Sequence, residues 1–375
     1  MKETQKQPAL QIFAGPRALK RLAERGLQAT DVHAVPAAAG GPKGLVLNKL
    51  DQFLFGEWLP QSGQPVHLLG ASIGAWRMAT ACMTRSAAEI RHEFDRLATE
   101  YAHQRYDDPP GSSVAPGAKY KMPDAATVTR GFSAKLDEVF AGHEAAVLSH
   151  PQFRLHVFTS RGRHVLAREG KLRTPAGYLG AFGANALGRR MLGGWLERVV
   201  FSDARSPLPL PLNDFRTRQV ALTEENLRPS VLASCSIPFW LKAVHDIPGA
   251  PRGAYWDGGI TDYHLHLNYA AMGEEALVLY PHFQQQVVPG WLDKIFKGRH
   301  RASPFLDNLV VLAPHPDWIA KLPRGKLPDR NDFAHYGMDV SARAKAWLSA
   351  VREGERLRDE FAALCGQASV QAEAL

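Results

Sequence analysis

The feature that most limits the fold is a strand, glycine-rich turn and helix pattern that occurs twice in direct succession. An apolar segment at 31–39 leads into the turn GGPKG at 40–44 and then into apolar residues at helical spacing over 45–59. The segment PVHLLG at 65–70 leads in the same way into a short turn and a second helical pattern. Strands connected through helices run parallel, so the sequence predicts an α/β sheet covered by helices.

Further segments extend this prediction along the chain. Apolar or alternating runs predict strands at 153–160, 217–222, 275–281 and 306–314. The Pro-, Gly- and Ser-rich segment 105–124 predicts a long loop, either a lid over a site or a plain surface loop. Apolar positions three and four residues apart over 341–366 predict one amphipathic helix. We therefore divide the chain into a domain at 1–340 and a C-terminal helical segment at 341–375 packed on it.

The composition limits which binding partners and which cell compartment we expect for this chain. The 375-residue chain has a formal charge of +8, which favours an anionic membrane or a nucleic acid. None of the usual nucleic-acid-binding motifs occurs, so we expect no nucleic acid partner. The three cysteines, Cys82, Cys235 and Cys365, have no zinc-ligand spacing and fit a reducing compartment. A polar N-terminus and the lack of any 18-residue apolar run predict a cytoplasmic protein, in peripheral contact with membranes at most.

The second turn contains a serine between two glycines, Gly70-Ala71-Ser72-Ile73-Gly74. When this G-x-S-x-G pattern connects a strand to a helix, the turn is too tight for side chains at the glycine positions. The serine hydroxyl then projects above the sheet, at the positive end of the following helix. The pattern predicts a nucleophile at Ser72, with an ordinary turn serine as the alternative.

The first turn can supply hydrogen-bond donors for such a nucleophile. Glycines at Gly40, Gly41 and Gly44 allow backbone N–H groups to approach a developing negative charge. The turn is not a phosphate-binding P-loop, because Lys43 is followed by glycine rather than serine or threonine. The alternative is a tight turn whose glycines serve geometry alone.

A candidate base lies far downstream in GAYWDGGITDYHLH. Asp257 follows an apolar-aromatic pair and precedes Gly258 and Gly259. Partial desolvation of a carboxylate there would raise its pKa and make it a better proton acceptor. An ordinary Asp-Gly-Gly turn is the alternative.

Taken together, the glycine-rich loop ending in Lys-Gly, the G-x-S-x-G turn and the late Asp-Gly-Gly resemble the patatin-like phospholipases. The resemblance implies a three-layer α/β/α fold with a mostly parallel central sheet and a serine–aspartate dyad without histidine. It assigns Ser72 as nucleophile, Asp257 as base, the amides of Gly40 and Gly41 as the oxyanion hole, and Lys43 as the basic loop position. It implies an acyl lipid as substrate, whether a phospholipid, a lysophospholipid or a neutral ester, with no metal or organic cofactor.

The motifs span residues 39–259, and VLASCSIPFW at 231–240 also resembles a segment of that family. One position departs from the family pattern: Ala39 stands where the loop usually has its first glycine. If that position requires a positive φ, alanine there costs about 1 kcal/mol or more, and otherwise it is harmless. The departure concerns the oxyanion loop rather than the dyad.

Two other functional classes are compatible with the residues. An α/β-hydrolase-type esterase with a Ser–His–Asp triad requires a histidine after the acid. The candidates for that histidine are His264, His266, His282, His315 and His335. His264 and His266 also have the spacing of a metal-binding pair on a strand, but no further ligand stands at a convincing distance along the chain.

The basic charge suggests the remaining class, a non-catalytic lipid or membrane adaptor. The segments 179–201 and 289–301 combine apolar residues such as Trp291 and Ile295 with cations such as Arg198 and Lys294. Such segments either lie in the interface of an anionic membrane or pack their apolar side on the protein core.

Overall fold

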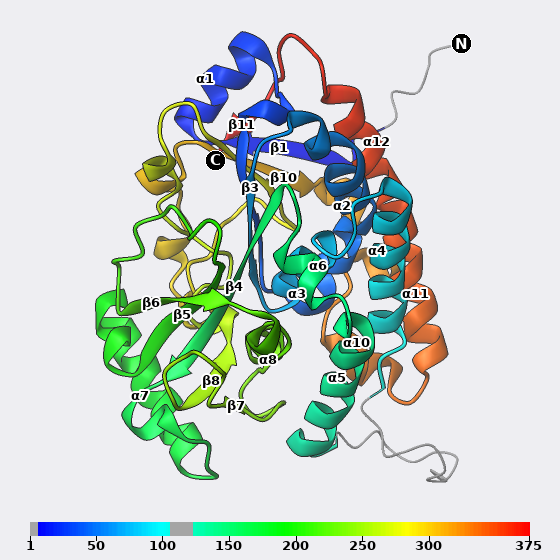
Figure 1. The fold of residues 1–375 in the computed structure, drawn as a ribbon. Coiled ribbons are helices and arrows are strands. Elements are labelled where there is room, and N and C mark those ends of the chain that lie inside the picture. The colour runs from blue at the N-terminus through cyan, green and yellow to red at the C-terminus, as the bar shows by residue number, and fades with distance from the viewer. Residues whose placement is uncertain (1–6, 106–122) are drawn as a thin grey trace.

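The computed structural model describes residues 7–105 and 123–375. Its centre is one twisted sheet in which the neighbouring strands follow the order β11-β1-β10-β9-β2-β3-β4-β5-β6, and β7 and β8 are attached at β4 (Figure 1). The strands are β1 Leu10–Ala14, β2 Val32–Ala37, β3 Val66–Ala71, β4 Phe153–Gly162, β5 Leu196–Asp203, β6 Thr217–Leu222, β7 Val244–His245, β8 Ala254–Asp257, β9 Leu277–Pro281, β10 Leu309–Pro314 and β11 Glu373–Ala374.

The strands at the centre of the sheet run parallel. β10, β9, β2, β3 and β4 pair in parallel, whereas β1 is antiparallel to β10 and β5 is antiparallel to β4. The strands predicted at 31–39, 65–70, 153–160, 217–222, 275–281 and 306–314 are all present. The expected mostly parallel, three-layer α/β/α organisation is confirmed.

The side chains of each strand alternate between the two faces of the sheet, and a hydrophobic core lies on each face. Leu68 on β3 joins a core cluster that includes side chains from the helices, while its neighbour Leu69 joins a cluster on the other face. Successive side chains of a strand point to opposite faces, so both faces of the sheet are buried.

The helices are α1 Pro16–Arg25, α2 Asn48–Phe53, α3 Ile73–Ala81, α4 Ala87–Ala102, α5 Ala125–Phe140, α6 Glu144–Leu148, α7 Arg173–Leu187, α8 Glu224–Cys235, α9 Pro316–Ile319, α10 Asn331–Tyr336, α11 Val340–Glu353 and α12 Glu355–Leu364.

The C-terminal segment differs from the prediction of one helix over 341–366. It forms α11 and α12, which are separated at Gly354. A side chain at Gly354 would approach the carbonyl oxygen of Val46 to 2.6 Å, so glycine permits close packing where the helix breaks. Trp347 of α11 and Phe361 of α12 belong to the main core cluster, and α11 lies beside α4 (Figure 1).

Two further expectations from the sequence concern the loop at 105–124 and the segment 179–201. Most of the predicted loop at 105–124 lies outside the described residues. The segment 179–201 is not one interfacial stretch, because its last residues belong to the fully buried strand β5. Only its first part, in α7 and the short turn Arg189–Gly194, reaches the surface.

Candidate active site

The pairing of β4 brings Ser72 and Asp257 together from distant parts of the sequence. The first half of β4 pairs in parallel with β3, up to the pair Ala71 and Phe158. Its second half pairs with the antiparallel strand β8, starting with Thr159 opposite Asp257. The carboxyl ends of β3 and β8 therefore meet head to head beside β4, with Ser72 immediately after one and Asp257 at the end of the other.

The serine turn has the strained geometry that its glycines predict. Ser72 has φ 56° and ψ −128°, a backbone conformation that non-glycine residues rarely adopt. A Cβ on Gly70 would lie 2.4 Å from the Cα of Ala75, and one on Gly74 would lie 2.0 Å from the carbonyl oxygen of Ala37. Glycine at both positions is what allows the strand to turn directly into α3.

A buried serine that sequence analysis did not single out holds this turn in place. The Ser72 amide donates to Ser234 Oγ at 2.9 Å, and Ser234 Oγ donates to the Phe158 carbonyl at 2.7 Å. The Asp257 amide donates to the Ser236 carbonyl at 2.9 Å. The end of α8 therefore fixes both the serine turn and the aspartate, which gives a structural reason for the small residues in 231–240.

Asp257 is buried and lies on the wall of the same cavity as Ser72. Burial raises the pKa of Asp257 from 3.8 to about 6, while the Ser72 hydroxyl, the charge of Arg330 and the Gly259 amide act in the opposite direction. The Gly259 amide donates to Asp257 Oδ1 at 2.7 Å. A carboxylate in this state accepts a proton from the neighbouring hydroxyl more readily than an ordinary aspartate does.

The glycine-rich loop lies next to these two residues. In the described part of the chain, the amides of Gly40, Gly41 and Ile73 donate to no protein acceptor. Gly40 lines the cavity that holds Ser72, and Gly41, with φ 58°, lies beside the Arg330 side chain, which lines the same cavity. The loop brings unpaired donors to the serine turn, where they are available to an anion.

Ala39 fits this loop without strain. It is not among the residues with positive φ, so its backbone does not require glycine. A Cβ on Gly259 would lie 2.5 Å from the Ala39 methyl, and that methyl therefore occupies the space beside the Asp-Gly-Gly turn. Gly258 is equally constrained, because a Cβ there would lie 2.1 Å from the Phe158 carbonyl oxygen. The close contact between the two turns depends on glycines on the aspartate side.

Ser72 and Asp257 open onto a cavity of about 240 Å³. The cavity is lined by Ala39, Gly40, Lys43, Ser72, Ile237, Pro238, Asp257, Gly259, Ile260, Tyr263, Trp291, Lys294, Asp329, Arg330 and Asn331. A smaller cavity of about 40 Å³ shares Ser72, Ile237 and Arg330 and is otherwise largely apolar. No local pattern in the sequence marks Arg330, which reaches the site from the loop before α10.

No histidine of the described residues lines the cavity that holds Ser72. His264 is fully buried, and its ring Nδ1 contacts the Gln286 carbonyl and the Val288 amide. His266 interacts with Ser303, and His315 caps α9. Over residues 7–105 and 123–375, no three His, Cys, Asp or Glu side chains gather as they would around a metal ion.

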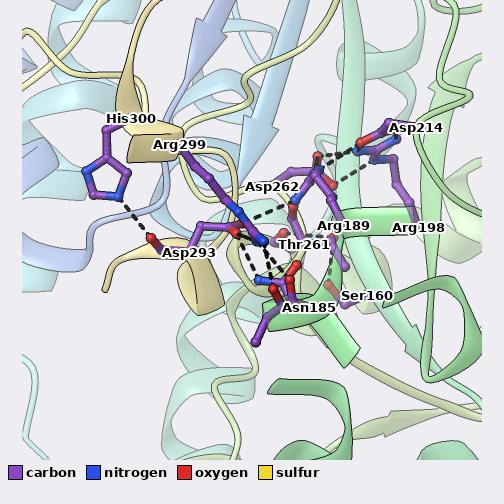
Figure 2. Close-up of polar contacts among 12 residues, drawn as sticks. Ser160, Asn185, Arg189, Arg198, Asp214, Thr261, Asp262, Asp293, Arg299 and His300 are labelled. Atoms are coloured by element: carbon purple, nitrogen blue, oxygen red, sulfur yellow. Dashed lines mark hydrogen bonds and ion pairs between the residues drawn. The ribbon is translucent and has the colours of Figure 1, made fainter. Parts of the chain in front are cut away.

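A buried network of ion pairs supports the loop that follows Asp257 (Figure 2). Arg198 makes two hydrogen bonds to Asp262, at 2.6 and 2.7 Å, and another to Asp214 at 2.7 Å. Arg189 donates to Asp214 at 2.9 Å and to Asp262 at 3.2 Å, and lies 3.5 Å from Asp293. Each buried carboxylate therefore has a cationic partner, as buried charges require.

The network extends to both sides of the cavity. Ser160 Oγ donates to the Asp257 carbonyl at 2.9 Å and lies 3.0 Å from Thr261 Oγ1. Asp293 accepts from Arg299 at 2.8 Å and is followed by Lys294, which lines the cavity. The same set of contacts thus fixes the Asp257 carbonyl and the segment that carries Lys294 and Trp291.

The segment 289–301 forms short helical turns rather than one amphipathic helix. Leu292 is buried, and Phe296 stacks on Phe182 of α7 with ring centroids 6.0 Å apart. Trp291 and Ile295 remain 39% and 64% exposed. Within the part of the chain that the structure describes, no helix has both the length and the apolar character needed to cross a bilayer.

Comparison with known proteins agrees with this geometry. A family model described as patatin-like phospholipase matches residues 57–264, which is more than half of the chain and includes Ser72 and Asp257. No protein with a curated description matches the chain. The resemblance inferred from the glycine-rich loop, the serine turn and the Asp-Gly-Gly turn is confirmed, and the chain belongs to the patatin-like phospholipases, a family of lipid acyl hydrolases.

Proposed function

We propose that the protein hydrolyses an ester bond of an acyl lipid, with Ser72 as nucleophile and Asp257 as its base. The observation that carries the proposal is the placement of Ser72 and the buried carboxyl of Asp257 on the wall of one cavity, where the ends of β3 and β8 meet beside β4. The family match supports the lipid acyl hydrolase class. The particular dyad and the ester substrate are our inference from the site.

In the first half of the reaction, Ser72 Oγ bonds to the carbonyl carbon while its proton moves to the Asp257 carboxylate. The carbonyl electrons move onto oxygen, and the amides of Gly40, Gly41 and Ile73 stabilise the resulting oxyanion. Each well-placed donor of this kind contributes about 3 kcal/mol to lowering the barrier. Collapse of the intermediate breaks the bond to the alcohol oxygen, which takes the proton from Asp257.

In the second half, a water molecule gives a proton to Asp257 as its oxygen bonds to the acyl carbon. Collapse of this second intermediate breaks the bond to Ser72 Oγ, which recovers the proton from Asp257. The products are a carboxylic acid and an alcohol, and both residues return to their starting states. No metal or organic cofactor enters either half.

Substitution of the two residues tests the dyad directly. Ser72→Ala and Asp257→Asn should each remove nearly all hydrolysis of a p-nitrophenyl acyl ester, because one lacks the nucleophile and the other the proton acceptor. Ser86→Ala and Asp359→Asn, at a helix cap and on the surface away from the cavity, are matched controls that should keep wild-type turnover. Turnover by either dyad variant at the wild-type rate would contradict the proposal.

The triad alternative predicts a different set of losses. Substituting His264, His266 or His315 by alanine should leave activity within about tenfold of wild type, because none lines the cavity. Loss of a triad member costs about four decades of rate, and a loss of that size in any of the three would favour the triad.

Labelling with a fluorophosphonate probe distinguishes an enzyme from a non-catalytic adaptor. Stoichiometric labelling at Ser72 supports an enzyme, and a folded protein that does not react supports an adaptor.

We also propose that the cavity opens toward the surface of an anionic membrane. Exposed apolar side chains lie on α7, on the turn after it and on the two segments that contact α7 beside the cavity, and we call them the rim face: Leu179, Leu187, Met191, Phe239, Trp291 and Ile295. Two ring contacts connect its parts, Tyr178 with Phe239 and Phe182 with Phe296, each with centroids 6.0 Å apart. Apolar side chains of this kind insert at the lipid interface while neighbouring cations meet the headgroups.

Vesicle flotation tests the rim face. Wild-type protein should float with vesicles of mixed phosphatidylcholine and phosphatidylglycerol, and less with phosphatidylcholine alone. Leu187→Asn and Ile295→Asn should weaken flotation without unfolding the protein, because these side chains are 85% and 64% exposed. Met338→Asn, an exposed apolar position outside the rim face, is the control. Equal flotation of the rim variants and wild type would contradict this part of the proposal.

A further inference from the structure

Arg330 is a cation of the active site that the reaction described above does not use. It belongs to the loop before α10, outside the residues 57–264 that the family model matches. Together with Ser72 and Ile237 it lines both the cavity of about 240 Å³ and the smaller, largely apolar one. The Arg330 side chain therefore lies at the junction of the two cavities, where Ser72 would hold the reacting carbonyl group.

The guanidinium group of Arg330 lies beside the loop that carries the unpaired amides. A Cβ on Gly41 would lie 3.5 Å from Arg330 Nε and 3.7 Å from Arg330 Nη2. The guanidinium group therefore occupies the space that a side chain at Gly41 would fill. Its N–H donors lie next to the backbone whose amides we assign to the oxyanion.

These N–H donors are not used within the protein. In the described part of the chain, the Arg330 side chain donates no hydrogen bond to a protein acceptor and forms no ion pair, and the adjacent Asp329 is paired with Lys326 at 2.9 Å. Arg330 Cζ lies 5.8 Å from the ring centroid of Trp240, which lines the smaller cavity. Contact with an aromatic ring attracts the charge but leaves the N–H groups available to a stronger acceptor.

Buried Asp332 fixes the loop that carries Arg330. Its carboxylate accepts a hydrogen bond from Trp347 Nε1 at 2.8 Å and lies 2.8 Å from Lys326 Nζ. It also accepts from the Asp329 amide at 3.1 Å, so the backbone just before Arg330 is held in place. A donor that is already in position needs little reorganisation when negative charge develops beside it.

The charge of Arg330 also acts on the dyad. Burial is the main cause of the raised pKa of Asp257, and the charges of Arg330 and Lys294 lower that pKa. The other titratable groups that interact with Asp257 stay neutral, because burial raises their pKa: Tyr178, Cys235 and Tyr263. Since arginine keeps its proton over the whole working pH range, its charge is present in every step of the reaction.

We propose that Arg330 is a further catalytic residue, whose guanidinium group donates a hydrogen bond to the oxyanion. When Ser72 Oγ bonds to the carbonyl carbon, the electron pair of the carbonyl moves onto its oxygen, and an Arg330 N–H binds this oxygen alongside the loop amides. Arg330 keeps all its protons and releases the oxygen when the carbonyl forms again. This inference rests on the proposed ester hydrolysis and adds a residue from outside the matched family region to its machinery.

An uncharged substrate separates this role from the binding of an anionic group. We would measure kcat and KM for p-nitrophenyl butanoate in wild type, Arg330→Ala and Arg330→Lys. Arg330→Ala should lower kcat about a hundredfold with KM nearly unchanged, as expected for an interaction made only in the transition state. Arg330→Lys should recover part of the loss, because it keeps a charge but not the planar donor group. Arg252→Ala, at an arginine that is 91% exposed and outside both cavities, should keep wild-type turnover.

Two further measurements distinguish catalysis by Arg330 from support of the fold. Methylguanidinium added to Arg330→Ala should restore part of kcat, whereas sodium chloride at the same ionic strength should not. The acid limb of the kcat/KM profile should also move to higher pH in Arg330→Ala, because removal of the cation raises the pKa of Asp257.

The outcomes separate this inference from the proposed function. A kcat of Arg330→Ala close to that of wild type would overturn the role of Arg330 while leaving the dyad intact. A large loss of kcat that methylguanidinium does not restore, together with a lower free energy of unfolding in urea, would show that Arg330 supports the fold and would also overturn it. Wild-type turnover by Ser72→Ala would instead overturn the proposed ester hydrolysis itself.

Discussion

Replacing Asp257 by asparagine should make the folded protein more stable at the same time as it removes activity. The carboxyl is buried, and desolvation raises its pKa from 3.8 to about 6 despite the hydrogen bonds and cations beside it. The folded state therefore favours the uncharged form of this side chain more than the unfolded state does. Asparagine has nearly the same shape and carries no charge, so it avoids the cost of burying the carboxylate.

The size of the stability gain in Asp257→Asn, and the pH range over which it holds, follow from the pKa of Asp257. A change from 3.8 to about 6 corresponds to about 3 kcal/mol of lost stability when the group is charged. Because the folded-state pKa is the higher one, this loss is complete above about pH 6, shrinks as the pH falls from about 6 to about 4, and disappears below that. The advantage of Asp257→Asn should follow the same course.

Urea unfolding followed by tryptophan fluorescence gives the free energies directly. We expect Asp257→Asn to unfold with a free energy up to about 3 kcal/mol larger than wild type at pH 8, and with little difference at pH 4. Other groups that titrate over this range affect both proteins alike and cancel in the comparison. Asp359→Asn, at an exposed carboxylate, should show no comparable gain. An Asp257→Asn protein that is no more stable than wild type at pH 8 would show that this carboxylate is not buried at a cost, and would refute the reasoning.

Other predictions test separate parts of the site and the core. The kcat/KM of wild type for an uncharged ester should fall about tenfold per pH unit below about pH 6, as Asp257 becomes protonated, and a flat profile down to pH 4.5 would contradict its role as base. Gly74→Ala places a Cβ 2.0 Å from a carbonyl oxygen of β2, so we expect a loss of at least about 2 kcal/mol in urea unfolding together with weaker fluorophosphonate labelling. Ser234→Ala leaves the amide of the serine turn without its acceptor and should cost about 2 kcal/mol in stability and lower kcat, whereas unchanged values would show that the turn holds itself. Burial lowers the pKa of His67 to about 4 and that of His156 well below 6.5, so the unfolding free energy should fall as the pH is lowered from 6.5 to 4, with a smaller slope in His67→Gln.

The parts of the fold that sequence analysis predicted are those with strong local signals. Val35 and Leu68 lie in apolar runs that end in glycine turns, and both runs form parallel strands of the central sheet. The serine turn and the Asp-Gly-Gly turn have tight backbones that permit only glycine at particular positions. Where the backbone itself restricts the residue type, the sequence carries the information.

The parts that were missed depend on contacts across the fold. The strand β5 contains Glu197 and Arg198, which look like surface residues but are buried against partners far away in sequence. Ser234 lies in the segment 231–240, whose resemblance to the family assigned it no role, and Arg330 has unremarkable neighbours in the chain. Only the fold brings the two residues to Ser72. No local pattern encodes such pairings.

The six-charge cluster of three arginines and three aspartates has a consequence for how this sequence can vary. Loss of one member, such as Arg198, would leave the buried Asp262 with only the 3.2 Å contact from Arg189, which costs up to about 3–5 kcal/mol. Exchange of both for apolar residues of matching volume is far less harmful. In the descent of this chain, Arg198 and Asp262 should therefore vary as a covarying pair, and any redesign of the neighbouring loop must replace them together.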